Sequence, residues 1–504
     1  MIFLGRGINV GEEEPKEQDV YLSDAARRQG VYVTGTTGTG KTTLLKSIVQ
    51  QDMEDAENPA VIVLDPHGDM IDDLLEVVPD HRLDYTVLFA PGDRKHQHDY
   101  PQGLNILSCN RDDDQEKELV SSTVISTLHK LFFYSWGPRM EDLLRNSILT
   151  LMHKADSTLL DIWMLLADEN YRLEQTMFLT EPFQLRFWAL FERYSAHDRA
   201  EIAGSSLNKI GRFLGNPIIR NIVGQPKNAF DLEKLMNNGG ILLCDLSKGD
   251  LGEDNSTLLG AVIVNLILIA ALRRRDIPIE ERRRVHLIVD EYQSFATETF
   301  PTLQSEARKY NIDVIVAHQY RDQLDELNRG STLNVANFIT LRVSGKDGLE
   351  LATQFDNSPD EPEIRYEPIP KHVATFDGVQ VFEDRKDPKT GGVMKYAVGQ
   401  PRRMYSDVAA ETANEMARLP NYDALCRVLE GRKLVEYLIQ LEAPHKPSKK
   451  DQAARQEKAD YIREQSRKRG RPRKTVERLI SRKLQNLPPV ADQTPTDDIP
   501  PARG

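Results

Sequence analysis

The sequence predicts an α/β fold with a largely parallel sheet, an all-helical insertion and a basic C-terminal tail. Short apolar runs recur along the chain, and segments with apolar residues at helical spacing separate them. Several runs end in Asp or Gly and lead into a loop and a helix. This pattern is typical of βα units whose strands are buried on both faces of a sheet. The predicted strands cover residues 31–34, 61–64, 86–89, 241–244, 286–289, 314–317 and 338–343.

Changes of pattern divide the 504 residues into four segments. Between the third and fourth predicted strands, the apolar residues keep helical spacing and no strand run occurs, which predicts an all-α domain inserted into the core. Near its end the chain becomes polar and basic, and then rich in proline, which predicts a disordered tail with one helix around residues 476–484. The predicted segments are residues 1–110 for the N-terminal portion of the core, 111–235 for the insertion, 236–442 for the C-terminal portion of the core and 443–504 for the tail.

The C-terminal portion of the core contains a more polar stretch between residues 356 and 410. Within it, the sequences VQVF (379–382) and MKYAVG (394–399) flank a Pro-Lys-Thr-Gly-Gly turn. This arrangement predicts a hairpin that pairs the two runs. Residues 419–440 are expected to add one or two final strands.

Composition excludes several classes of protein. Apolar residues make up 39% and charged residues 28% of the chain, which excludes a disordered, collagen-like or disulfide-rich protein. The three cysteines form no C-x-x-C pair, so we expect neither a zinc site nor a disulfide framework, and a reducing cytoplasm fits. The N-terminus does not resemble a signal peptide. The most apolar run, 258–272, is shorter than the roughly 20 residues that span a bilayer, so we expect a buried helix and no integral membrane segment.

The strongest motif is GTTGTGKT at residues 35–42. It follows a predicted strand, precedes a helical pattern and fits G-x-x-x-x-G-K-[ST], the loop that cradles nucleotide phosphates. Its glycines let the backbone approach a phosphate, Lys41 would reach the β- and γ-phosphates, and Thr42 would offer its hydroxyl to Mg²⁺. ATP and Mg²⁺ are therefore the predicted cofactors. The predicted nucleotide-binding residues are Gly35, Thr36, Thr37, Gly38, Thr39, Gly40, Lys41, Thr42 and Thr43.

A second group of candidate residues lies at the ends of two later strands. Asp290 and Glu291 end the apolar run of LIVDEYQ. An Asp in this place helps to hold Mg²⁺, and the carboxylate that follows it is placed to activate water as a general base. The run at 314–317 leads into His318 and Gln319, and we expect Gln319 to contact the γ-phosphate or the attacking water. Alternatively, Gln319 only caps its strand through hydrogen bonds.

Together these motifs resemble the HerA/FtsK branch of P-loop motors, and within it the coupling ATPases of conjugation and type IV secretion. The resemblance implies a RecA-like ATPase core that assembles as a homo-oligomeric ring, usually a hexamer, and moves DNA. It also implies that Asp290 binds the metal, Glu291 is the catalytic base and Gln319 is the sensor. The likeness rests on GTTGTGKT, LDPHGD (64–69), GRFLGNPIIRNIVGQ (211–225), LIVDEYQ, EARKYNIDVIVAHQY (306–320) and NFITLRV (337–343).

The resemblance further implies that an arginine from a neighbouring subunit completes the site, where it would offset charge in the transition state. Arg308 and Arg342 occupy positions similar to those of the family's arginines. Which of them acts in this way, if either does, stays open. A salt bridge at the surface or at the edge of the core is an equally good explanation for each.

Two departures from the family pattern bear on function. Only 34 residues precede Gly35, too few for the N-terminal barrel of HerA proteins, and no N-terminal transmembrane helices occur as in membrane-bound coupling proteins. We therefore expect a soluble, cytoplasmic coupling ATPase that translocates DNA. The alternatives are a HerA-like motor for DNA end processing, a nucleotide-switched DNA-binding scaffold and a phage packaging motor. A relaxase would be the partner in conjugation, and a nuclease in end processing.

The C-terminal tail differs from the rest of the chain in charge. The whole chain has a net charge of −13, whereas residues 445–504 contain 16 basic and 8 acidic residues, which suggests that this segment binds a polyanion. Its sequence RKRGRPRK (467–474) resembles an AT-hook, a thin segment whose arginines enter the narrow minor groove of A·T-rich DNA. Nonspecific binding to phosphates is the alternative. The predicted DNA-binding residues are Arg469, Gly470, Arg471 and Pro472.

Overall fold

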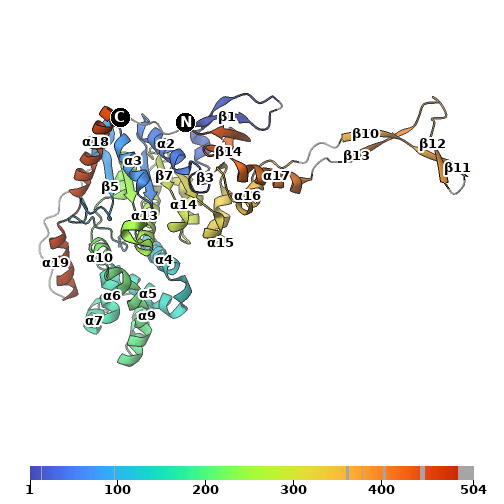
Figure 1. The fold of residues 1–504 in the computed structure, drawn as a ribbon. Helices are drawn as coiled ribbons and strands as arrows, with labels where there is room; N and C mark the ends of the chain where they lie inside the picture. The colour runs from blue at the N-terminus through green and yellow to red at the C-terminus, as the bar shows by residue number, and fades with distance from the viewer. Residues whose placement is uncertain are drawn as a thin grey trace. The chain divides into compact units, whose positions relative to one another are not determined.

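The chain forms two compact units. The first comprises Met1–Leu341 and Asn421–Gly504, and the second comprises Arg342–Pro420. Figure 1 labels the helices and strands of both units. The structure, a computed structural model, describes residues 1–12, 14–95, 97–358, 363–376, 379–400, 404–442 and 449–485.

An eleven-stranded sheet runs through the first unit in the order β2-β1-β15-β14-β9-β3-β8-β7-β4-β6-β5. The strands from β9 to β5 are parallel to their neighbours. They match the seven apolar runs of the sequence, so the predicted parallel α/β core is confirmed. These strands are β3 (Val31–Thr34), β4 (Ala60–Asp65), β5 (Thr86–Phe89), β6 (Ile241–Asp245), β7 (Val285–Val289), β8 (Ile312–His318) and β9 (Asn337–Thr340).

Helices bury the parallel strands. Residues of α2 (Lys41–Glu54) and α3 (Asp69–Val77) share one hydrophobic cluster with alternate strand residues such as Val31 and Val33. The core helix α13 (Glu253–Arg273) is the one helix of the described residues that is long and apolar enough to cross a membrane, and 89% of its apolar window is buried inside the structure. This burial agrees with the core helix expected from the sequence.

Four antiparallel strands extend the sheet beyond β9. Two of them are the final strands expected from the sequence, and the other two, at the N-terminus, were not expected because Gly5 and Gly7 interrupt the apolar alternation. The structure gives a reason for Gly7, since a Cβ there would lie 2.2 Å from the carbonyl oxygen of Leu438 on the paired strand. The four strands are β1 (Ile2–Asn9), β2 (Gln18–Leu22), β14 (Asp423–Glu430) and β15 (Lys433–Gln440).

Between β5 and β6 the described residues form helices and no strand. The first of these helices, α4, packs against α13, while α5, α6 and α9 pack against one another. All of them belong to the same compact unit as the sheet. The helices are α4 (Asp114–Leu131), α5 (Pro138–Leu151), α6 (Leu159–Ala167), α7 (Glu169–Thr176), α8 (Pro182–Phe191), α9 (Ala196–Leu214), α10 (Pro217–Val223) and α11 (Leu232–Asn238).

Two helices form in the segment for which the sequence predicts disorder. They are α18 (Lys449–Arg467) and α19 (Arg473–Leu484). Helix α19 agrees with the helix expected around residues 476–484, whereas α18 was not expected, so the prediction of disorder needs correction for residues 449–467. The remainder of the predicted tail, 443–448 and 486–504, lies outside the described residues.

Helix α18 docks on the edge of the sheet through a few residues at helical spacing. Ala459 and Ile462 are buried in the hydrophobic cluster. The hydroxyl of Ser466 accepts a 2.8 Å hydrogen bond from the backbone N–H of Leu88 on β5, the last strand of the sheet. The helix therefore covers an edge that would otherwise offer unpaired backbone groups. A mostly polar sequence hides this stripe, which explains why composition alone predicts disorder.

The second unit contains a ribbon made of two two-stranded antiparallel sheets, β10-β13 and β11-β12, and two packed helices, α16 and α17. The predicted turn is present, since the N–H of Asp387 donates to the carbonyl of Gly392 (2.8 Å). The predicted pairing is wrong: VQVF pairs with residues 370–376, and the strand that contains KYAVG pairs with 363–368. The backbone of the turn is hydrogen-bonded within residues 387–392. Both runs that flank it pair with residues that precede them in the chain, 363–368 and 370–376. The elements are α16 (Gly345–Ala352), β10 (Glu363–Pro368), β11 (Pro370–Phe376), β12 (Val379–Asp384), β13 (Lys395–Gln400) and α17 (Tyr405–Arg418).

Candidate nucleotide-binding site

The phosphate loop joins β3 to α2 at the carboxyl ends of the parallel strands. Gly40 is the N-cap of α2 with a φ of 113°, a left-handed conformation that favours glycine. A Cβ there would also lie 2.9 Å from the ring of Tyr422. The hydroxyl of Thr39 donates to the carbonyl of Thr36 (2.7 Å) and closes the loop. No described side chain caps the first turn of α2, so its N–H groups suit a phosphate oxygen.

Lys41 opens α2 and lies between the two predicted carboxylates. Its Nζ is 2.5 Å from Oε1 of Glu291 and 3.3 Å from Oδ1 of Asp290. All three side chains are buried, so they pair where water screens them little. The structure therefore brings Lys41 of the phosphate loop next to the two carboxylates that follow β7, although about 250 residues separate them in the sequence.

Glu291 is held in an unusual conformation by several donors. Its φ of 45° lies in the left-handed region, which is costly for a residue with a side chain and is found mostly at functional sites. Gln319 donates to Oε1 (2.9 Å), and Gln293 donates to Oε2 (2.6 Å). Burial alone would raise the pKa of Glu291, but the ammonium of Lys41 and the hydrogen bonds from Lys41, Gln293 and Gln319 lower it. The carboxylate is thus ionised and able to accept a proton.

The β8 end contributes two neighbouring residues with different roles. Gln319 also contacts Thr37 of the phosphate loop, with 3.2 Å between Oγ1 and Oε1, so it links the loop to Glu291. His318 is fully buried beside the hydroxyl of Tyr32. Burial, together with the charges of Arg321 and Lys41, lowers the pKa of His318 to about 3. His318 is therefore neutral, and its contacts indicate a packing role.

Two further carboxylates lie at the ends of β4 and β6. Asp65 accepts hydrogen bonds from the backbone N–H groups of His67, Gly68 and Met70. Burial is the main cause that raises the pKa of Asp65 and of Asp245 to about 6 each; the charge of Asp290 adds to the shift of Asp65, and the charge of Asp65 adds to that of Asp245. No role was predicted for Asp245 or Gln293. An Asp that ends an apolar run was the available signal for Asp245, whereas Gln293 ends the LIVDEYQ motif without a residue type that indicates catalysis.

The two candidate arginines lie in different units. Arg308 is exposed on the short 3₁₀ turn η5 (Ala307–Tyr310) of the first unit. Arg342 begins the second unit, where its guanidinium donates to the carbonyl of Leu419 (3.3 Å). The role of each arginine in a neighbouring subunit stays a prediction.

The residues expected to form an AT-hook make the turn between α18 and α19. This turn packs on loop 97–102: a Cβ on Gly470 would lie 2.0 Å from the carbonyl oxygen of Tyr100. The guanidinium of Arg467 stacks on the Tyr100 ring, 4.3 Å from its centroid. Arg469, Gly470, Arg471 and Pro472 therefore belong to a packed turn, whereas an AT-hook requires a free, extended segment. The structure does not support the minor-groove geometry expected from the sequence.

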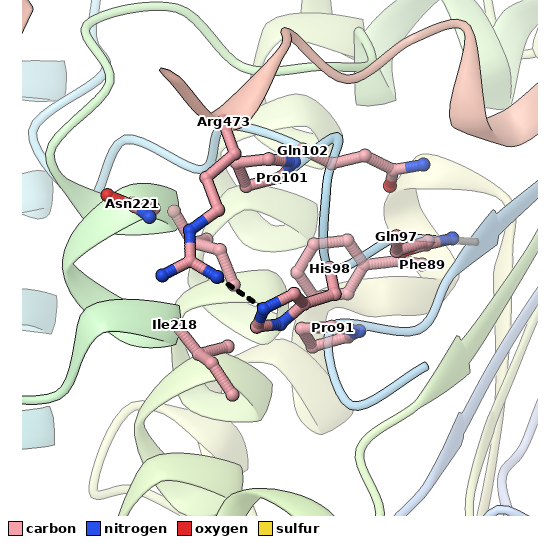
Figure 2. A pocket seen from close by; sticks show the side chains of 10 residues that line it. Phe89, Pro91, Gln97, His98, Pro101, Gln102, Ile218, Asn221 and Arg473 are labelled. Carbon is pink, nitrogen blue, oxygen red and sulfur yellow. Dashed lines mark hydrogen bonds between the residues drawn. The ribbon is translucent and has the colours of Figure 1, made fainter. Parts of the chain in front are cut away.

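Figure 2 shows how the start of α19 is held in a pocket beside α10. The guanidinium of Arg473 points to the ring of His98 and donates a hydrogen bond to Nε2. Its Nε donates to Glu477 (2.7 Å). The pocket thus anchors the C-terminal helices, at a place separate from the phosphate loop.

Solved structures of a plasmid coupling protein and of VirB4 have the same fold. The plasmid coupling protein TrwB in complex with ADP and Mg²⁺ is 16% identical, with a TM-score of 0.56 over 89% of this chain and 96% of that one. TrwB in complex with the non-hydrolysable ATP analogue ADPNP is 17% identical, with a TM-score of 0.54 over 88% and 95%. VirB4 of Thermoanaerobacter pseudethanolicus is 13% identical, with a TM-score of 0.55 over 88% and 96%. These likenesses confirm the expected RecA-like core. No curated protein matches the chain.

The family described as "Helicase HerA, central domain" matches residues 8–267. The match covers more than half of the chain and includes the phosphate loop, Asp65 and the helices between β5 and β6. It agrees with the resemblance to the HerA/FtsK branch that the motifs carry. The chain therefore belongs to the family of the HerA helicase central domain.

Proposed function

We propose that this protein is an ATP-driven DNA translocase of the kind that couples ATP hydrolysis to conjugative DNA transfer. The contact between Lys41 of the phosphate loop and the buried Glu291 carries the proposal. Phosphoryl transfer to water requires a positive charge beside the phosphate oxygens and a base that accepts a proton from the attacking water. The buried cluster contains both, as the ammonium of Lys41 and the ionised carboxylate of Glu291. A protein that only switches its conformation on binding nucleotide does not need such a base.

The residues of the site fit a nucleoside triphosphate. The loop N–H groups and the Lys41 ammonium would hold the β- and γ-phosphates, while the hydroxyl of Thr42 and the carboxylate of Asp290 would hold Mg²⁺. When bound, Mg²⁺ neutralises charge on the phosphate oxygens. A γ-phosphate on the loop would compete with Glu291 for Lys41. Nucleotide binding would therefore free the Glu291 carboxylate to face water.

The proposed reaction assigns one step to each side chain. Gln319, which already bridges Thr37 and Glu291, would orient a water molecule. Glu291 would take a proton from this water, whose oxygen attacks the γ-phosphorus as the bond to the bridging oxygen breaks and ADP leaves. An arginine from a neighbouring subunit, Arg308 or Arg342, would offset the developing charge. This last step requires a ring of copies, for which we propose a hexamer with DNA as the transported substrate.

A HerA-like motor for DNA end processing is the second candidate, favoured by the family to which residues 8–267 belong. The two candidates differ in partner, since conjugation requires a relaxase and end processing a nuclease. They share the same ATPase chemistry and the same need to move along DNA.

DNA-stimulated turnover and directed movement together test the proposal. We expect phosphate release by the full chain to rise with added duplex or single-stranded DNA, and the protein to displace streptavidin from an end-biotinylated strand only with ATP. Glu291→Gln should keep nucleotide binding while hydrolysis falls by about 10²- to 10⁴-fold. Turnover without displacement on any DNA would reject the translocase, and near-normal turnover of Glu291→Gln would reject the general base.

A further inference from the structure

We infer that Gln293 positions the catalytic base Glu291, and that Lys130 of α4 in turn holds Gln293, so that the helices between β5 and β6 control the base. The inference rests on the proposed role of Glu291 in hydrolysis. It adds to that role two residues to which the motifs assign no function, and a route that joins the helical region to the site.

The first link is the hydrogen bond from Nε2 of Gln293 to Oε2 of Glu291, at 2.6 Å. Lys41 and Gln319 both contact the other oxygen, Oε1. Gln293 is thus the donor that fixes the second oxygen, and with it the rotation of the carboxylate plane. A carboxylate acts as a base efficiently only when its lone pair faces the water it deprotonates.

The position of the Gln293 side chain is set mainly by the position of its own backbone. The oxygen of its side-chain amide is buried and has no hydrogen-bond partner among the described residues. The amide is therefore held through its nitrogen, by Glu291. Any shift of the Gln293 backbone would move this donor relative to Glu291, because no other hydrogen bond of the amide resists the shift.

The second link fixes that backbone from α4. The Nζ of Lys130 donates to the carbonyl of Gln293 (2.7 Å) and to that of Ala296 (2.5 Å). Burial lowers the pKa of Lys130 to about 7, an effect that Lys248 increases and Asp325 opposes. The ammonium of Lys130 thus exchanges part of its hydration for hydrogen bonds to the protein. Here the contacts are two carbonyls of the segment that follows Glu291.

Further contacts join α4 to the segment that follows Glu291. The carboxylate of Glu298 contacts Nδ1 of His129 (2.8 Å), and the N–H of Glu298 donates to the hydroxyl of Ser126 (3.1 Å). His129, Lys130 and Ser126 all belong to α4, the helix that begins the region between β5 and β6. A movement of α4 would thus reach Glu291 through Gln293.

Steady-state phosphate release at saturating ATP, with the full chain, tests the first link. Gln293→Ala should lower kcat by about 10- to 100-fold with KM for ATP within about twofold, because the base is misplaced while the phosphate loop is intact. Gln293→Glu keeps the size of the side chain but removes the donor, so its kcat should fall at least as far. Gln323→Ala, an exposed glutamine on a nearby turn, is the control and should match wild type.

A double-mutant cycle separates this inference from the role of Glu291. In the Glu291→Gln background, Gln293→Ala should cause no further loss in single-turnover phosphate release. An equal loss in both backgrounds, or a raised KM with unchanged kcat, would overturn the positioning role alone. Near-normal turnover of Glu291→Gln by itself would overturn both the base and its positioning.

The second link has its own variants. Lys130→Met should lower kcat, Lys130→Arg should restore most of it, and adding Lys130→Met to Gln293→Ala should cause no additional loss. Lys117→Met is the matched control, since Lys117 lies on the same helix and pairs at the surface with Asp114. Unchanged kcat in Lys130→Met, or no restoration by arginine in a variant that melts like wild type, would overturn control from α4.

Discussion

The phosphate-loop region and the C-terminal helices belong to the same compact unit, yet they are held by different forces. Around Lys41 a few charged side chains are buried and paired, and their positions follow a strict motif at the carboxyl ends of central strands. Around α18 a few apolar residues dock a highly charged helix on the last strand, β5. The first arrangement makes the site reactive, but the desolvation of its buried charges lowers the stability of the fold. The second creates stability and leaves little trace in composition.

Removing the cation of the site should give the largest effect. Lys41→Ala should reduce ATP hydrolysis to the background rate, since the γ-phosphate loses its ammonium. It should also lower the free energy of unfolding by about 2–4 kcal/mol, because Asp290 and Glu291 stay buried without their partner. Phosphate release and urea unfolding measure the two effects. Lys46→Ala, an exposed lysine of the same helix paired with Asp73, should change either only slightly. An unchanged free energy of unfolding in Lys41→Ala would contradict the view that the site around Lys41, unlike the α18 contact, is held by buried charge pairs.

Truncating the apolar contact of α18 should come second. Ile462→Ala should cost about 2–4 kcal/mol of unfolding free energy, because a fully buried side chain is lost from the core cluster. ATP turnover of the folded variant should stay close to wild type. Leu484→Ala, at the exposed end of α19, should cost less than about 0.5 kcal/mol. Equal, small losses for both would mean that α18 is not part of the core.

The basic turn after α18 should bind DNA phosphates without sequence preference. Replacing Arg469 and Arg471 together by Ala should weaken DNA binding by about tenfold, to the same extent on A·T-rich and G·C-rich duplexes, with a shallower dependence on salt. Titrations at two salt concentrations measure this. A loss confined to the A·T-rich duplex would restore the AT-hook, despite the packed turn seen at Gly470.

Removing the buried charge of Asp245 should give the smallest effect. The pKa of Asp245 is raised to about 6 in the folded protein, from an ordinary value of 3.8. The folded state therefore binds the proton more tightly, and the ionised carboxylate costs stability fully above pH 6 and not at all below pH 3.8. Asp245→Asn should be more stable than wild type by about 1 kcal/mol at pH 7.5 and equal to it near pH 4. Urea unfolding at both pH values checks the sign, and a penalty at pH 7.5 would contradict it.

Sequence reasoning predicted those regions of the molecule where chemistry restricts the choice of residue. The parallel strands follow from apolar runs, and Lys41, Asp290, Glu291 and Gln319 follow from motifs that place them at strand ends; the structure brings all four into one cluster. Their catalytic roles stay predictions.

The features that the sequence did not predict depend on contacts over long distances in the chain. The ribbon of the second unit forms from pairings that local turn signals do not determine. Helix α18 docks through sparse residues such as Ile462, which a polar segment conceals. Gln293 contacts Glu291 through a single hydrogen bond, and a glutamine four residues after the end of a strand carries no catalytic signal of its own.

The edge of β5 has a consequence for the way the chain is made. Ser466 bonds to Leu88 across 378 residues, so the ribosome has released most of the protein before this edge can be covered. Until then, β5 presents a strand edge that other nascent chains can pair with. Synthesis that stops shortly before α18 would leave the folded sheet with this edge open. Only copies in which α18 has been translated therefore cover the edge of β5.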